Sequence, residues 1–228
     1  QARLMRGINF KKNILPHLGV IAFFAVITLV YMSPTLEGNR LQQHDKKQWR
    51  GMTKEARDYN KKNNDDHTFW TNSMFGGMPT YQMLGGFKYN TFIIGQLRWI
   101  QGNAFPGDSG KLFLLMVSFY FMLIAFGISI PLAVIGGLSY AFCSNTLISL
   151  SAGHGTKVLA MGFAPFVAMG TLLVMRQWKF FIGASLMAFF LAAQISANHP
   201  QITYYLAMTI ALYMLIELIQ AIRYNYVN

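Results

Sequence analysis

The sequence predicts an all-α polytopic membrane protein, with six transmembrane helices and a large first outer loop that bears interfacial helices. The segment Leu112–Thr156 contains no Asp, Glu, Lys or Arg, so it fits two consecutive membrane spans better than the core of one small soluble domain. The chain is 54% hydrophobic and only 12% charged, about half the charged fraction of a typical soluble domain. Seven of the eight acidic residues lie between residues 34 and 111, which places them in one hydrophilic insert.

The first predicted span covers residues 14–33 and follows a short basic N-terminus, residues 1–13. The span is too long for a signal-peptide core and no small-residue cleavage site follows it, so we expect a retained anchor. Basic residues that flank a span favour the cytoplasmic side, and four of them precede this one: Arg3, Arg6, Lys11 and Lys12. Residues 34–111 are therefore expected at the outer face, periplasmic or extracellular.

The outer loop is expected to contain ordered elements. Apolar residues at helical spacing predict an amphipathic helix over Trp49–Tyr59. Residues 70–82 are rich in aromatic residues, Met and Gly and almost uncharged, which is typical of backbone laid against a membrane surface or tucked into a cavity. Residues 87–100 are expected to form a short interfacial helix.

The rest of the chain, residues 112–228, is predicted to contain five further spans. Pro131 opens the second of these five within its first helical turn, where a missing N–H costs little. The short inner loops carry Arg176, Lys179 and Arg223, whereas the short outer loops carry Lys157 alone. This distribution agrees with the positive-inside rule and puts both ends in the cytoplasm. The expected bounds are about 112–130, 131–151, 158–175, 180–196 and 202–219.

Charge and motif content exclude several function classes. The net charge of +11 does not indicate nucleic-acid binding, because the bases lie in the outer loop or flank apolar segments. Cys143 is the only cysteine, so no internal disulfide is expected. The sequence contains no P-loop, dinucleotide fingerprint, zinc-ligand spacing or Ser-nucleophile motif.

Four polar residues are predicted to emerge together at the outer face: Asp45, His154, Lys157 and His199. His154 and Lys157 are three residues apart, so a helical start to the fourth span would put them on one side. A carboxylate can act as a general base, while Lys and protonated His balance anionic oxygen. The group would therefore suit activation of a hydroxyl beside a bound phosphate.

Each of these residues also has a simpler interpretation. Asp45, flanked by Lys46 and Lys47, fits a solvated loop acid. Lys157 fits an interfacial anchor that extends to the headgroups, and the two histidines fit caps that bond helix-end carbonyls. The functional interpretation is favoured by the convergence of three separate loops in this topology.

Two further acidic positions are interpreted without a functional role. Glu217 is the only acid in a predicted span, a place that ordinarily marks function. It lies within about a turn of the cytoplasmic boundary, so we expect it to reach headgroup water. Asp65-Asp66-His67 fits a solvated turn better than a metal site.

Four stretches of the sequence are distinctive: Ser33–Asp45 (SPTLEGNRLQQHD), Trp70–Gln82 (WTNSMFGGMPTYQ), Ala152–Lys157 (AGHGTK) and Ala197–Tyr205 (ANHPQITYY). Together they resemble the YfhO family of bacterial membrane proteins, most closely its Bacteroidetes-type members. The resemblance spans nearly the whole chain, with departures at His44 and Gly155, which are left out of the expected site. Because family members are several times longer, it implies that this chain is the N-terminal part of such a protein.

The resemblance implies a GT-C-type glycosyltransferase of the bacterial inner membrane. Enzymes of that class take a sugar from a polyprenyl-phosphate carrier at the outer face, and they keep an essential acid in the first outer loop, the place of Asp45. The expected acceptor is an envelope glycan or protein. Asp45 is then the catalytic residue, while His154, Lys157 and His199 bind the carrier phosphate. No cofactor is required, although a divalent metal at Asp45 is compatible with the pattern.

Two other functions are compatible with the sequence. A non-catalytic scaffold, or a subunit of a cell-envelope or secretion complex, would use the aromatic stretch 70–82 to dock membrane partners. A transporter is less favoured, because transporters place ionisable residues near the bilayer midplane. The charges of these predicted spans lie only at their rims.

Overall fold

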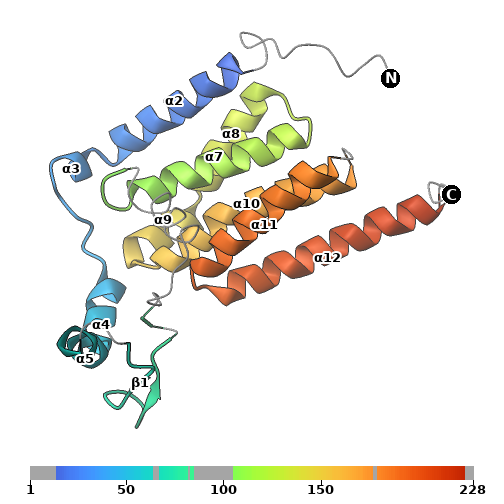
Figure 1. Ribbon diagram of the computed structural model, residues 1–228. Coiled ribbons are helices and arrows are strands. Elements are labelled where there is room, and N and C mark those ends of the chain that lie inside the picture. The colour runs from blue at the N-terminus through green and yellow to red at the C-terminus, as the bar shows by residue number, and fades with distance from the viewer. Residues whose placement is uncertain (1–13, 64–66, 82, 85–104, 177–178, 224–228) are drawn as a thin grey trace.

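The computed structural model describes residues 14–63, 67–81, 83–84, 105–176 and 179–223. Within these residues the chain is mostly helical, with long helices side by side in a bundle and a small lobe at one end (Figure 1). The lobe consists of α4 (His44–Met52), α5 (Lys54–Lys62) and a hairpin of two short antiparallel strands, β1 (Trp70–Thr71) and β2 (Met78–Pro79).

The bundle is built around α10, which packs against α7, α9, α11 and α12, while α7 in turn packs against α2 and α8. Helices α2 and α12 lie at its two edges (Figure 1). A four-residue helix, α3, follows α2 and leads to the lobe. The bounds are α2 Leu15–Tyr31, α3 Ser33–Leu36, α7 Ser109–Ala125, α8 Ile130–Ala141, α9 Ser144–Ala152, α10 Gly155–Met175, α11 Phe180–Ser196 and α12 Pro200–Arg223.

The helices have the composition of membrane spans. Among the described residues, α10 and α12 are each long and apolar enough to cross a bilayer, and α8 with α9 forms a third candidate as a bent pair. Helices α2, α7 and α11 are also apolar, at 17 residues each. None of the residues of α12 is buried, so its apolar surface suits lipid or protein neighbours. The chain is an all-α membrane protein.

The segment predicted as one continuous span, 131–151, is interrupted. Helices α8 and α9 meet at an angle of 42°, and Cys143 between them is extended, with φ −65° and ψ 149°. Thr146 Oγ1 donates to the Tyr140 carbonyl at 3.3 Å and lies 3.2 Å from Cys143 Sγ. Backbone groups freed inside a membrane need such partners, and the Thr146 hydroxyl supplies one.

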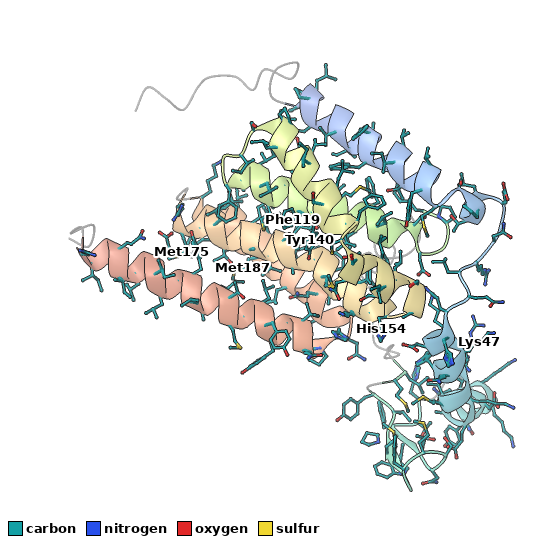
Figure 2. The ribbon with its side chains drawn as sticks, turned by 180° about the vertical axis from the view of Figure 1, so that it is seen from behind. Lys47, Phe119, Tyr140, His154, Met175 and Met187 are labelled. Atoms are coloured by element: carbon teal, nitrogen blue, oxygen red, sulfur yellow. The ribbon has the colours of Figure 1, made fainter. Side chains whose placement is uncertain are left out.

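Close backbone contact joins α10 to α11. A Cβ added at Gly170 would lie 2.7 Å from the Met187 nitrogen, and one added at Gly183 would lie 2.8 Å from the Gly170 carbonyl oxygen. Small residues allow such approaches between membrane helices. Between α7 and α8, the rings of Phe119 and Tyr140 stack with centroids 4.5 Å apart (Figure 2).

An ion pair ties α12 to α10 at the end of the bundle away from the lobe. Arg176 Nη2 lies 2.6 Å from Glu217 Oε1, and Arg176 Nε donates to the same oxygen at 2.7 Å. The Glu217 side chain is only 16% exposed. Glu217, the one acid of the predicted spans, therefore neutralises the charge of Arg176 at the end of α10. The sequence analysis did not anticipate this pairing.

The lobe differs from its sequence prediction. The single helix expected over Trp49–Tyr59 is two helices that meet at Thr53, whose buried hydroxyl donates to the Trp49 carbonyl at 2.7 Å. Residues 70–81 form the hairpin and its loop, which is anchored to α5 through Glu55. The helix predicted over 87–100 lies outside the described residues.

The Glu55 carboxylate organises the hairpin by accepting several hydrogen bonds. It accepts one from the Thr71 hydroxyl and one from the Ser73 backbone N–H at 3.0 Å. These bonds, that of Thr71 first, hold the pKa of Glu55 below its ordinary value. The carboxylate is therefore charged at neutral pH and fixes the hairpin on α5.

Candidate functional site

Asp45 and His154 are in direct polar contact where the lobe meets the bundle. His154 Nε2 lies 3.1 Å from Asp45 Oδ2. Asp45 is in the first turn of α4 and His154 is the residue before α10, so the start of α4 contacts the turn between α9 and α10. Figure 2 shows His154 at the end of the bundle that faces α4, where Lys47 is labelled. The side chains are 46% and 50% exposed, so a substrate can reach both.

Gly153 permits this close approach. Its φ of +104° is left-handed and ends α9, a conformation that costs a residue with a side chain about 1–2 kcal/mol. A Cβ at this position would lie 3.0 Å from the Gln43 Cβ and 3.6 Å from the Asp45 Cβ. Only glycine therefore satisfies both the backbone angle and the contact with the start of α4.

Lys157 and His199 lie near the pair without bonding to Asp45. Lys157 Nζ donates to Asn145 Oδ1 at 3.3 Å, which links α10 to α9. Partial burial and the charges of Lys157 and His154 lower the pKa of His199. His199 therefore lies within electrostatic range of both side chains. All four predicted site residues thus lie at one end of the bundle. Among the described residues, only Asp45 and His154 of the four share a direct polar contact.

Asp108 is a buried acid of this region that the sequence analysis did not single out. It precedes α7, is 8% exposed and pairs with Lys111. Its Oδ2 accepts from Gln43 Nε2 at 2.9 Å and from Lys46 Nζ at 3.1 Å. Burial opposes ionisation, but Lys111 and Lys46 outweigh it and hold the pKa of Asp108 below its ordinary value. One feature of the sequence could have identified this ion pair: Asp108 comes directly before a predicted span, and Lys111 follows it three residues later.

Gln43 connects the start of α4 to the bundle. Its Nε2 donates to the Leu150 carbonyl of α9 at 2.6 Å as well as to Asp108. The residue is 4% exposed, and its Oε1 is buried without a hydrogen-bond partner among the described residues. Gln43 therefore links the start of α4 to α9 and to the residue before α7, while its Oε1 accepts no hydrogen bond from the described residues.

A cavity of about 440 Å³ opens beside this network. It lies between the chain that leads from α3 into α4 and the residues just before α7. Its basic lining residues, Arg40, Lys46, Lys47 and Arg50, outnumber its single acid, Asp108. The other lining residues are Thr35, Asn39, Leu41, Gln42, Gln43 and Gly107.

At this end of the bundle the Asp45 carboxylate lies near basic side chains of Lys, Arg and His. Within the described part of the chain, no group of three or more His, Cys, Asp or Glu side chains is arranged to hold a metal ion. The groups that do gather suit proton transfer at Asp45 and anion binding by Lys, Arg and His. No protein-family model, curated protein or solved structure matches the chain.

Proposed function

We propose that the chain provides the outer-face site of a membrane glycosyltransferase, in which a sugar passes from a polyprenyl-phosphate carrier to a cell-envelope acceptor. The observation that carries the proposal is the contact of 3.1 Å between His154 Nε2 and Asp45 Oδ2. It joins a half-exposed carboxylate to a cationic turn at the end of a bundle of membrane helices. A reaction between a lipid-linked phosphate and a hydroxyl needs both kinds of group.

In the proposed reaction, the acceptor oxygen attacks the anomeric carbon as the bond from that carbon to the carrier phosphate oxygen breaks. Asp45 takes the hydroxyl proton, and the electron pair of the broken bond leaves on the phosphate. Direct displacement inverts the anomeric carbon. His154 orients the Asp45 carboxylate by donating an N–H to its Oδ2, which leaves the other carboxylate oxygen for the acceptor.

The cations of the site have the complementary role. Lys157 and His154 balance the charge that develops on the departing phosphate. His199, whose pKa is lowered by partial burial and by Lys157 and His154, gains a favourable partner when an anion binds between them. Phosphate binding should therefore raise the pKa of His199.

We further propose that six segments cross the bacterial inner membrane, with a cytoplasmic N-terminus. Helices α2, α7 and α11 are apolar but short for a span, and local thinning of the bilayer or flanking side chains that extend to the headgroups accommodate such lengths. Helix α2 begins and α12 ends at the end of the bundle away from the lobe (Figure 1). Labelling with a membrane-impermeant maleimide in a Cys143→Ala background tests this: Lys157→Cys should react in intact cells and Lys179→Cys should not. The reverse pattern would invert the topology.

The enzymatic proposal is tested in cells that lack the gene and express either the full-length wild-type protein or Asp45→Asn at equal membrane levels. Envelope glycans and lipid-linked sugars are compared by mass spectrometry. The expected result is loss of one defined sugar modification in the Asp45→Asn cells. An unchanged profile, in an organism whose envelope does change on deletion of the gene, would reject the enzyme.

A docking subunit of an envelope complex is the second candidate, because aromatic side chains are exposed on the hairpin. Phe75 is 88% exposed, and Trp70 and Tyr81 are about half exposed. Such residues are enriched in protein interfaces. Replacing Phe75 and Trp70 by Ala would then impair the envelope more than Asp45→Asn does, whereas the enzyme predicts the opposite order.

A further inference from the structure

The cavity beside α4 has features of a binding site that the proposed reaction has not used. Gln43, Lys46, Lys47 and Arg50 all line it, and they recur at the spacing of three and four residues that puts side chains on one side of a helix. Asp45 belongs to the same helix but is not among the lining residues. One side of α4 thus contacts His154, while another faces the cavity.

The positive charge of the cavity is only partly neutralised. Asp108 is its one acid, and that carboxylate is already shared with Lys46 and with Lys111. Within the described parts of the chain, no carboxylate pairs with Arg40, Lys47 or Arg50. Clustered cations around a concave space favour an anionic ligand.

Gln43 lines the cavity, but its amide is not available to a ligand. Its Nε2 donates to Asp108 and to the Leu150 carbonyl, and its Oε1 is itself buried. The groups open to a ligand are therefore the cationic side chains, and the cavity suits a ligand that carries a negative charge.

We propose that this cavity binds the acceptor of the sugar through a phosphate or carboxylate group that contacts Arg40, Lys47 and Arg50. This inference rests on the proposed glycosyltransferase. The carrier phosphate binds separately, at Lys157, His154 and His199. Asp45 precedes Lys46 of the cavity lining and contacts His154, so the proposal requires the acceptor hydroxyl to reach around α4 to this carboxylate.

The test uses the full-length protein in neutral detergent and isothermal titration with glucose 6-phosphate and glucuronate, which combine hydroxyls with a phosphate or a carboxylate. Glucose is the uncharged control ligand. Charge-assisted hydrogen bonds contribute about 1.5–3 kcal/mol each, so Arg40→Gln and Arg50→Gln should each weaken binding about 10-fold or more. Lys61→Gln, an equal loss of charge on the exposed surface of α5, should leave binding unchanged.

A second arm distinguishes the two anion sites. Binding of polyprenyl phosphate in neutral phosphatidylcholine nanodiscs should fall about 10-fold in Lys157→Gln and stay unchanged in Arg50→Gln. Wild-type protein that binds neither charged sugar, or cavity variants that bind them normally, would overturn the proposal. An equal loss of polyprenyl phosphate binding in Arg50→Gln would also overturn it, because the cavity would then belong to the carrier.

Different results would reject the proposed glycosyltransferase reaction and the proposed acceptor site. Normal turnover in Asp45→Asn rejects the reaction, and the role of the cavity as an acceptor site falls with it. Loss of turnover in Asp45→Asn, together with unchanged sugar-phosphate binding in Arg40→Gln and Arg50→Gln, rejects the acceptor site alone.

Discussion

His154 Nε2 lies 3.1 Å from Asp45 Oδ2, and this contact joins the start of α4 to the turn between α9 and α10. Both side chains are about half exposed, so the pair adds little to stability, as exposed ion pairs generally do. The proposed function gives this pair a chemical role at the end of the bundle that faces α4.

The first prediction concerns Gly153, which allows α4 to approach α9. Gly153→Ala should lose about 1–2 kcal/mol because its backbone is left-handed, and its Cβ would also displace α4 and the Asp45–His154 pair. Gly127→Ala is the matched control, because Gly127 has φ +82° but no atom within 4 Å of an added Cβ.

Both glycine variants should therefore lower the unfolding temperature of the purified protein, Gly153→Ala by more. Only Gly153→Ala should also reduce sugar transfer. Equal transfer by the two variants would show that the approach of α4 to Gly153 does not position the site.

The sequence predicts the long helices of the bundle where hydropathy alone determines that a segment is helical. Uncharged runs of membrane length leave helix as the only backbone state that satisfies its own polar groups, and α11 coincides with the predicted 180–196. The interruption at Cys143 was not anticipated, because it depends on the Thr146 hydroxyl reaching the Tyr140 carbonyl. The polar run Ser144-Asn145-Thr146 was its only signal.

The second prediction concerns the crossing of α10 and α11. Gly170→Ala should destabilise the protein by about 1–3 kcal/mol through overpacking, because its Cβ would lie 2.7 Å from the Met187 backbone nitrogen. Gly19→Ala in α2, where an added Cβ meets nothing within 4 Å, should be neutral or slightly stabilising. Thermal unfolding in detergent measures both, and equal midpoints would contradict the close contact.

The third prediction concerns Asp108 and pH. The pKa of Asp108 is lowered in the folded state from an ordinary value of 3.8, so its stabilising contribution is present above about pH 4 and is lost as pH falls further. Asp108→Asn would leave the largely buried Lys111 side chain without its partner and should cost about 3 kcal/mol at pH 7.

The difference in unfolding free energy between wild type and Asp108→Asn should therefore shrink as pH falls below about 4. Denaturant unfolding at several pH values measures it. A difference that stays constant down to pH 3 would show that Asp108 is not held as a charged group.

The sequence predicted a group of four residues at one face, and the structure brings two of them, Asp45 and His154, into direct contact, while the role of the group stays a prediction. Topology alone brings Asp45, His154, Lys157 and His199 to one face, because their loops alternate along the chain. The cavity was not predictable, because its lining depends on which side of α4 faces the bundle. It also depends on Asp108, which in the sequence looks like an ordinary acid at the start of a helix. Gln43 likewise looks like a loop residue, and only burial shows its unused acceptor.

The central claim, that Asp45 is the catalytic base, is tested most directly by sugar transfer with purified full-length protein. Asp45→Asn is compared with Asp58→Asn, which removes an exposed carboxylate of α5. A general base contributes about 10²–10⁴-fold to rate, so Asp45→Asn should lose at least about 100-fold in turnover with an unchanged unfolding temperature, while Asp58→Asn keeps full activity. Equal turnover in the two variants would contradict the claim.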